Sequence, residues 1–290
     1  MSFYKYIKNP IKKEKIDILY FTRKSELQDI IHQKLFNRYS DTLKYFFDEQ
    51  YKIKVLEIKD NEIDADVTYI DFLIKIVQVK IKIKKLFKLN QNFDVRSIND
   101  VIKSEFNFTL DIVTLKNNLF LIYELSLMFE KILKKLDPKV VFLVCFYRVD
   151  AMAMSLACHN LGIKTVEYQH GAQNDNHLMY TSWLHCPKKG YELIPDTFWM
   201  WGDINKQRID KWATKTNKHK AIIGGNMWLA YNKKISIGET IEKIDNDKLT
   251  ILVSLQGDSF IPEFFIEFIE KFGSNYNWYF RDHPRIPISK

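Results

Sequence analysis

The spacing of apolar and polar residues in the amino-terminal part of the chain predicts short strands mixed with helices. Residues 16–21, IDILYF, form an apolar run typical of a buried strand, and residues 51–58, YKIKVLEI, alternate as a second strand does. Between them, a helix with Ser25 as its N-cap is predicted from the spacing of five apolar residues, Leu27, Ile30, Ile31, Leu35 and Phe36. Residues 67–89 fit the period of a helix and that of a strand, because β-branched side chains recur throughout. We favour a helix there.

The middle of the chain carries the clearest pattern. The predicted elements are a helix over 106–136 ended by Asp137 and Pro138, a strand over 139–146, a helix from the N-cap Asp150 to Gly162, and a strand over 164–168. A continuous apolar run such as KVVFLVCF is typical of a central parallel strand, which is buried on both faces. Strand, helix and strand therefore predict one βαβ unit.

The same alternation continues to the end of the sequence. The next elements are a strand over 197–202, a helix beginning at its N-cap Asp203, a strand over 220–225, a strand over 249–257, a helix over 262–273, and a strand over 277–280. Residues 231–248 are polar and poorly patterned, as linkers are. We therefore predict an α/β protein with a domain over 1–230, a linker over 231–248, and the start of a second domain over 249–290.

Charge and cysteine content narrow the classes of partner and compartment. The 290 residues carry a formal charge of +8, which favours anionic partners, although lysine-rich composition gives the same surplus. Three cysteines without a CxxC pair fit a reducing compartment. No apolar run reaches the roughly 18 residues that span a bilayer. Any membrane attachment is expected to be peripheral, through basic and aromatic side chains.

Polar loops follow the predicted parallel strands. In open parallel sheets, ligands bind beyond the carboxyl ends of the strands, where loop amides and helix N-termini converge. Four such loops are YRVD after Phe146, QHGAQNDNH after Tyr168, GD after Trp201, and QGDS after Leu255. Their side chains are expected to line one sheet edge, with Tyr147 and Arg148 among the contacts.

Two histidine-containing loops carry the candidate chemistry. His170, next to Gly171, is a candidate acid or base because imidazole titrates near neutrality. A turn histidine without a catalytic role is the alternative. The nearby His177 does not indicate a metal site, since no HExxH motif or fixed carboxylate spacing accompanies it.

The second histidine-containing loop is RDHPR, with Arg281, His283 and Arg285 around Pro284. Guanidinium groups match phosphate oxygens, and proline restricts the loop, although a basic surface turn is an alternative. Gln256 and Gly257 of SLQGDS are weaker candidates for contacts to a nucleotide.

The motifs EYQHG, PDTFWMWGD, IIGGN and RDHPR together resemble bacterial surface-polysaccharide transferases of the GT-B type. The capsule and lipopolysaccharide transferases that use CMP-activated acidic sugars are the most similar by motif, and the CDP-glycerol glycerophosphotransferases share a similar layout. The resemblance covers residues 139–285. It implies two Rossmann-like domains, a nucleotide-sugar donor, a glycan or glycolipid acceptor, and no required metal or other cofactor.

Carried over to this sequence, the resemblance implies roles for both sides of the reaction. His170 would face the acceptor, together with Gln169, Gly171, Tyr147, Arg148 and Asp203. The donor phosphate and nucleotide would be held by Arg281, His283, Pro284, Arg285, Gln256 and Gly257. The paired acidic residues that sialyltransferase-like members carry before a glycine are absent, so the resemblance does not identify the base.

Alternative functions remain open at the level of sequence. They are glycosyl transfer from a CMP-activated donor, polyol-phosphate transfer from a CDP-glycerol-type donor, a non-catalytic or partial binding domain of a polysaccharide-synthesis complex, and a nucleic-acid-binding module. Only the charge supports the last, and no nucleic-acid partner is expected. The second domain is expected to be incomplete, because only about 40 residues follow the linker where a domain needs on the order of 100. We expect a location in the bacterial cytoplasm, with the inner-membrane surface and other polysaccharide-synthesis proteins as further candidate partners.

Overall fold

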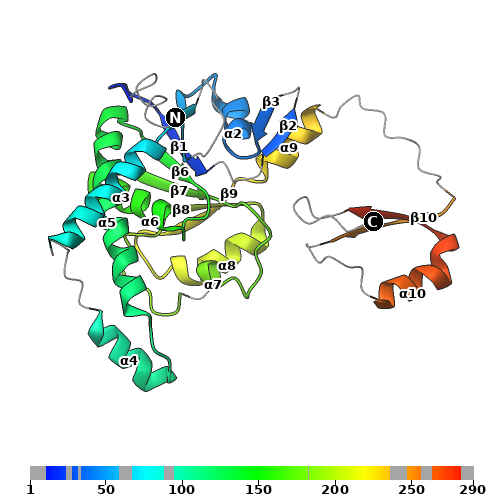
Figure 1. The fold of residues 1–290 in the computed structure, drawn as a ribbon. Coiled ribbons are helices and arrows are strands. Elements are labelled where there is room, and N and C mark those ends of the chain that lie inside the picture. The colour runs from blue at the N-terminus through cyan, green and yellow to red at the C-terminus, as the bar shows by residue number, and fades with distance from the viewer. Residues whose placement is uncertain are drawn as a thin grey trace. The chain divides into compact units, whose positions relative to one another are not determined.

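The computed structural model describes residues 11–23, 28–31, 34–58, 67–87, 95–181, 183–235, 247–255 and 263–281. The chain divides into two units, Met1–Lys234 and Ile235–Lys290. Figure 1 shows the first unit as a sheet with helices on both faces, and the second as a small strand and helix assembly.

The first unit is built on a seven-stranded parallel sheet. Its strands are β1 (Ile18–Arg23), β4 (Ile53–Ile58), β5 (Val67–Tyr69), β6 (Val140–Leu143), β7 (Lys164–Tyr168), β8 (Thr197–Met200) and β9 (Lys220–Ile223). Their order in space is β5-β4-β1-β6-β7-β8-β9, and every pairing is parallel. The order reverses between β1 and β6, which gives the doubly wound arrangement of Rossmann-like folds. The predicted α/β, Rossmann-like fold is confirmed.

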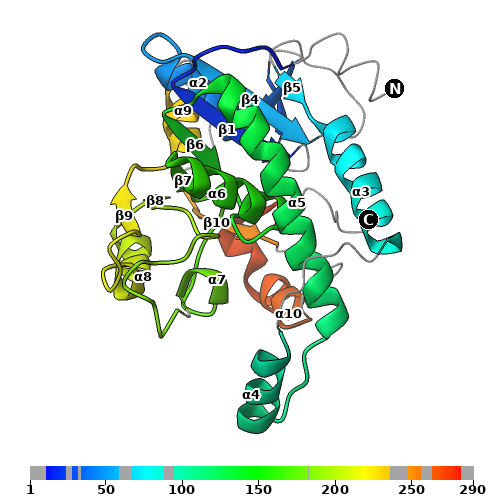
Figure 2. The same cartoon turned by 90° about the vertical axis from the view of Figure 1, so that its left-hand side faces the viewer.

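The described part of the first unit contains the following helices, and most of them pack on a face of the sheet. They are α2 (Ser40–Phe47), α3 (Asp71–Leu86), α4 (Arg96–Phe106), α5 (Ile112–Leu136), α6 (Val149–Leu161), α7 (Leu178–Thr181), α8 (Asp203–Ala213) and α9 (Met227–Ile235). In Figure 2, α5 runs across one face with α3 beside it, and α4 extends beyond the end of α5. The predicted βαβ unit of β6, α6 and β7 is confirmed, and Gly162 ends α6 in a left-handed conformation with φ 70°.

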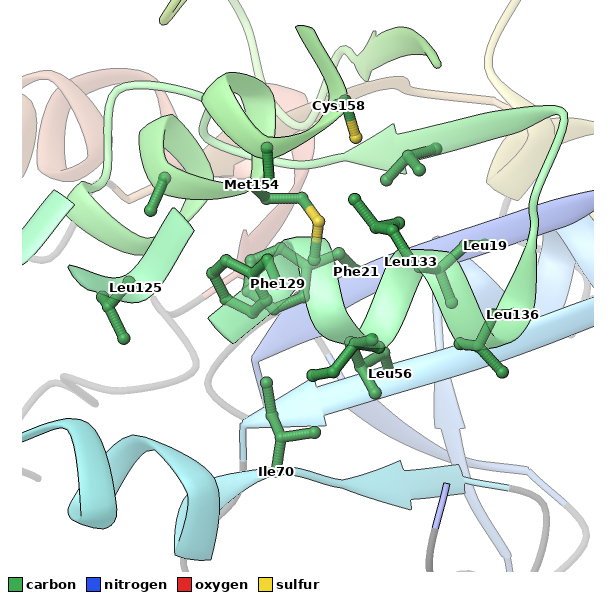
Figure 3. Packing of buried hydrophobic residues seen from close by; sticks show 14 of the residues in the cluster. Leu19, Phe21, Leu56, Ile70, Leu125, Phe129, Leu133, Leu136, Met154 and Cys158 are labelled. Atoms are coloured by element: carbon green, nitrogen blue, oxygen red, sulfur yellow. The ribbon is translucent and has the colours of Figure 1, made fainter. Parts of the chain in front are cut away.

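Side chains of β1 alternate between the hydrophobic clusters on the two faces of the sheet. Leu19 and Phe21 face α5 and α6, whereas Tyr20 faces α2 and α9 on the opposite side of the sheet. Phe21 meets Phe129 of α5 edge to face, with ring centroids 5.2 Å apart. Figure 3 shows this contact within a cluster that also contains Leu133. A strand buried on both faces explains why the apolar run at 16–21 predicts a strand correctly.

The long helix predicted over 106–136 is interrupted. Helix α4 ends at Phe106, where Asn107 adopts a left-handed conformation, and α5 begins after Asp111, whose side chain accepts a hydrogen bond from the backbone N–H of Thr114. In the described part of the chain, α5 is the one helix long and apolar enough to cross a membrane by length and composition. Charged residues such as Lys116, Glu124 and Glu130 interrupt this helix, so it does not contradict the prediction that no uninterrupted apolar run has this length. Core helices meet the same criterion, and buried residues of α5 pack against the sheet.

The helix predicted around Leu27 to Phe36 is wrong. The described residues there form an antiparallel hairpin of β2 (Gln28–Ile31) and β3 (Lys34–Asn37), in which Ile30 pairs with Leu35. Short runs of branched and aromatic residues fit the period of a helix and that of a strand equally well. Here the pairing of the two strands favours the hairpin. Ser25, the predicted N-cap, lies outside the described residues.

Two predicted N-caps are also corrected. Asp150 is the second residue of α6, whose N-cap is Arg148, and its side chain forms ion pairs instead. Asp203 is the first residue of α8, whose N-cap is Gly202. Aspartate at these positions still favours the helix, because a negative charge in the first turn complements the helix dipole.

The second unit contains one parallel strand pair. Its elements are β10 (Leu249–Ser254), α10 (Glu263–Phe272), the short 3-10 helix η1 (Gly273–Asn275) and β11 (Tyr276–Arg281). β10 and β11 pair in parallel from Leu249 opposite Tyr276 to Ser254 opposite Arg281. The predicted strand, helix and strand are therefore confirmed. Before this unit, α9 continues to Ile235, so the predicted linker over 231–248 begins as helix.

Candidate functional site

Three of the four polar loops predicted to line a sheet edge lie together. β6, β7 and β8 are neighbours and run in parallel, so the segments after Leu143, Tyr168 and Met200 leave the sheet at the same carboxyl edge. β1 ends at this edge too, with Arg23 as its last residue. The fourth loop, with Gln256 and Gly257, lies outside the described residues.

Two arginines meet one buried aspartate where the strand order reverses. Nε of Arg23 lies 2.8 Å from Oδ2 of Asp150, and Arg148 donates to both carboxylate oxygens, at 3.2 Å and 3.1 Å. Burial by itself would raise the pKa of Asp150, but the charges and hydrogen bonds of Arg148 and Arg23 outweigh it and lower that pKa. Two guanidinium groups against one carboxylate leave a net positive charge at this switch point.

The arginine pair is placed to meet an anion. The Arg23 side chain is 43% exposed and Arg148 is 19% exposed, whereas Asp150 is buried. A guanidinium has five N–H donors, and its planar shape matches the oxygens of a phosphate or carboxyl group. The switch point of a doubly wound sheet is also where ligands of such folds bind.

A buried carboxyl group lies beside these residues, on β7. Glu167 is 0% exposed; its Oε1 accepts a hydrogen bond of 2.8 Å from the Tyr180 hydroxyl, and its Oε2 accepts one of 3.2 Å from the Phe146 amide. Burial and then the neighbouring Glu167 raise the pKa of Tyr180, so the phenol stays protonated and donates. Glu167 thus connects β7 to the loop after β6 and to α7.

His170 lies next to this carboxyl group. Its Nδ1 is buried, has no hydrogen-bond partner among the described residues, and lies 3.9 Å from Oε1 of Glu167. Burial, followed by the charges of His177 and Arg148, lowers the pKa of His170 to about 4. The imidazole is therefore neutral at pH 7, and its side chain is 23% exposed.

Aromatic rings surround the imidazole. The Tyr147 ring centroid lies 6.4 Å from that of His170 and 5.6 Å from that of His177, and the His177 and Tyr180 rings meet edge to face at 4.7 Å. Burial is the main cause that raises the pKa of Tyr147, so its hydroxyl remains protonated at neutral pH. The site can therefore offer neutral donors and ring faces, together with the cationic pair.

Gln169 has a structural position. Its side chain is buried; it donates to the carbonyl oxygen of Gly171 at 2.9 Å and accepts from the Trp201 amide at 2.8 Å. The side chain thereby joins the loops after β7 and β8, and these two protein partners occupy it. Gly171 is open: a Cβ added there would meet no heavy atom within 4 Å.

The remaining predicted site residues belong to α8, to the second unit, or to segments outside the described residues. Asp203 lies exposed at the start of α8, at the same sheet edge. Arg281 is the last residue of β11 in the second unit and is exposed. His283, Pro284 and Arg285 lie outside the described residues. The structure thus brings together His170, Tyr147 and Arg148, and the proposed donor-side residues stay predictions.

Sequence reasoning missed three residues of this site, namely Arg23, Glu167 and Tyr180. Glu167 had a detectable signal, because it is the single acidic residue inside the otherwise apolar strand TVEY. Arg23 could have been considered as the residue that follows the first apolar strand. Tyr180 lies in the short segment LMYT, where nothing in the sequence distinguishes it.

Two surface depressions flank the sheet. One of about 550 Å³, lined by residues such as Asp17, Lys52 and Lys139, lies at the amino ends of β1 and β6. One of about 240 Å³ lies beside the loop after β7, where Arg208 pairs with Asp175. The larger depression is at the edge opposite His170. Ligands of parallel sheets bind at the carboxyl edge, so its size does not make it the functional site.

The chain was compared with known proteins. No protein-family model and no curated protein matches the sequence. Among solved structures, a UDP-GlcNAc 2-epimerase from Neisseria meningitidis bound to UDP-GlcNAc aligns at 13% identity and TM-score 0.42, over 93% of this chain and 66% of that one. A UDP-GlcNAc 2-epimerase from Methanocaldococcus jannaschii aligns at 12% identity and TM-score 0.45, over 92% and 66%.

A third solved structure is a putative UDP-N-acetylglucosamine 2-epimerase from Listeria monocytogenes, with 11% identity and TM-score 0.43, over 93% of this chain and 64% of that one. The chain thus spans less than two thirds of the length of these three proteins. Likenesses at this level carry no argument about substrate or reaction. The site geometry above therefore has to support any functional conclusion.

Proposed function

We propose that this chain is a glycosyltransferase that moves a sugar from a nucleotide-activated donor to a capsule, O-antigen or lipooligosaccharide glycan. The observation that carries the proposal is the neutral His170, with its unpartnered Nδ1 near Glu167, at the sheet edge that holds Arg23 and Arg148. A neutral imidazole can accept a proton from a hydroxyl group, and guanidinium groups bind phosphate. The motif resemblance favours a CMP-activated acidic sugar as the donor.

The proposed step begins with the acceptor hydroxyl beside the imidazole. Its oxygen attacks the anomeric carbon of the donor and forms the new glycosidic bond, while the bond from that carbon to the phosphate oxygen breaks. The nucleotide leaves with the bonding electron pair, and the hydroxyl proton passes to His170. A small shift of the ring would bring Nδ1–H onto Glu167, which leaves Nε2 as the accepting nitrogen and stabilises the charged imidazolium.

The leaving nucleotide needs positive charge near its phosphate. Arginine side chains can supply this charge, so the proposed transfer needs no metal or other cofactor. The motif resemblance implies that Arg281 and residues 283–285 of the second unit bind the donor phosphate. The switch-point pair of Arg23 and Arg148 would then meet an acidic group of the acceptor.

The proposal includes a location and partners. Three cysteines without a CxxC pair fit the reducing bacterial cytoplasm, where the acceptor would be a glycan or glycolipid that meets the enzyme at the inner-membrane surface. Other polysaccharide-synthesis proteins are proposed partners as well.

The donor and the role of His170 can be tested together. CMP-N-acetylneuraminic acid, UDP-GlcNAc and CDP-glycerol are offered with a lactoside as acceptor probe, and nucleotide release is measured. We expect release of CMP, and a His170→Gln variant whose kcat falls by about 10²-fold or more with little change in the KM for donor. His185→Gln, at an exposed histidine outside the site, is the matched control and should keep the wild-type rate.

The other outcomes separate the alternatives. Release from CDP-glycerol alone would point to polyol-phosphate transfer. Binding of CMP by calorimetry without release from any donor would point to a non-catalytic binding domain. If His170→Gln releases nucleotide at the wild-type rate, the imidazole is not the base. The double variant Arg281→Ala, His283→Ala tests the donor side, where loss of CMP binding is expected.

A further inference from the structure

Helix α3 carries an apolar stripe that does not face the core. Its inner side places Val77 and Ile81 in the core of the first unit. A second set of apolar residues recurs at spacings of three and four and is 48–79% exposed, namely Ile76, Val79, Ile83 and Leu86. At about 100° per residue, this spacing places the four side chains on one face of the helix.

Lysines border this stripe. With about 100° between successive residues, Lys75 and Lys82 lie along one margin and Lys80 along the other. Lys80 and Lys84 also reach inward to the buried Glu124 of α5. Long lysine stems can lie on an apolar surface while the ammonium groups reach polar surroundings.

Helix α4, which follows α3 in the order of described helices, has an exposed apolar face of its own. None of its residues is buried, and its amino acids still segregate into an apolar and a polar face. The exposed apolar residues of α4 and of the segment that follows it are Ile98, Val101, Phe106, Phe108 and Val113, each at least half exposed. In Figures 1 and 2, α4 lies beyond the end of α5 and away from the sheet. A side-chain hydrogen bond from the Leu110 amide to Asn99 fixes α4 to the start of α5.

We infer that α3 and α4 form a docking surface for an anionic lipid bilayer. An apolar stripe with lysines on both margins is the pattern of helices that lie in the plane of a membrane interface. The charges decide between occupants. Two copies of this chain meeting through the stripe would bring their lysines together, whereas anionic headgroups complement them.

The inference is tested with the full chain and sedimented lipid vesicles. One set contains phosphatidylcholine alone, and the other contains about one third phosphatidylglycerol. We expect binding to the anionic vesicles to be at least about tenfold stronger and to weaken as salt is added.

Two variants test the two components of the surface. The triple variant Ile76→Ser, Val79→Ser, Ile83→Ser removes apolar area, and its control is Ile204→Ser, Ile223→Ser, Leu229→Ser, at exposed apolar residues elsewhere in the first unit. The pair Lys75→Glu, Lys82→Glu reverses charge, and its control is Lys188→Glu, Lys215→Glu. The α3 variants should each weaken binding by about tenfold, and the controls should bind as the wild type does.

Several results would overturn the inference. Equal binding to both vesicle sets, or equal loss in the α3 variants and their controls, would remove the α3 surface as the lipid contact. A wild-type dimer in sedimentation without lipid that the triple serine variant dissociates would assign the stripe to a second copy. Because every substituted residue of α3 is exposed, unchanged circular dichroism is expected and verifies folding in each variant.

Discussion

Nδ1 of His170 lies 3.9 Å from Oε1 of Glu167, a separation too long for a hydrogen bond and short enough that a small movement of the ring would make one. Oε1 already accepts from Tyr180, while the buried Nδ1 has no partner within the part of the chain that the structure describes. A buried polar atom without a hydrogen bond destabilises the fold, so the arrangement favours a ligand whose binding lets the imidazole form one.

The first prediction concerns stability and pH. The pKa of His170 is lowered from 6.5 to about 4 on folding, so the unfolded chain binds the proton more readily. The folded state is therefore destabilised as pH falls from 6.5 to about 4, by up to about 3 kcal/mol for this residue. Burial also lowers the pKa of His219, which changes stability with pH in the same direction.

His170→Gln separates the two histidines. Urea unfolding of wild type and variant at pH 7.5 and pH 5 should show a smaller loss of stability at the lower pH in the variant, and His219 contributes to the loss that remains. An identical loss in both proteins would mean that His170 titrates normally.

The second prediction concerns the hydroxyl that Glu167 binds. Tyr180→Phe removes the donor to Oε1 and leaves that buried oxygen without it, which should cost about 1–3 kcal/mol of unfolding free energy. Without the Tyr180 donor, the negative charge on Oε1 stabilises the protonated imidazole of His170 more strongly, so the pKa of His170 should rise, as NMR titration would show. Tyr191→Phe, which removes a hydroxyl that donates to a backbone carbonyl, is the control and should leave that pKa unchanged. No change of the His170 pKa in Tyr180→Phe would contradict the coupling.

The third prediction concerns the switch-point cluster. Asp150→Asn removes the charge that pairs with Arg23 and Arg148. The two arginines then repel each other and lose hydrogen bonds, which should lower the free energy of unfolding by about 3 kcal/mol. This is the low end for buried pairs, because Arg23 is partly exposed. The control, Asp17→Asn, loosens a partly exposed pair with Lys139 and should lower the urea midpoint much less than Asp150→Asn does. Equal midpoints for Asp150→Asn and wild type would show that the cluster does not stabilise the fold.

The central strands could be predicted from sequence because both of their faces are buried. An apolar run such as VVFL of β6 indicates a buried parallel strand when turns and a helix flank it. The hairpin of β2 and β3 was missed because its two strands have four residues each, too few to distinguish a helical from a strand period.

The candidate site was only partly predictable for a topological reason. Loops that follow parallel strands share an edge, which is enough to place His170 and Arg148 together. Arg23 pairs with Asp150 across 127 residues of sequence, because β1 lies next to β6 in the sheet. Sequence order alone does not reveal that neighbour.

The fourth prediction separates stability from activity at two glycines. A Cβ on Gly224 would lie 1.9 Å from the ring of Trp199, whose Nε1 donates to Gly225. Gly224→Ala must therefore displace that ring, and a cost of about 1–3 kcal/mol is expected. Gly171→Ala meets nothing within 4 Å and should unfold as the wild type does.

Gly171 nevertheless borders His170, and a ligand that approaches the backbone there would meet the new methyl group. Gly171→Ala should therefore raise the KM for acceptor while the urea midpoint stays unchanged. Gly224→Ala serves as the comparison for a variant that loses stability. If both variants lose activity but only Gly224→Ala loses stability, unfolding cannot explain the lost activity of Gly171→Ala. A Gly171→Ala variant with wild-type KM would place the acceptor elsewhere along the sheet edge, nearer Arg23 and Arg148.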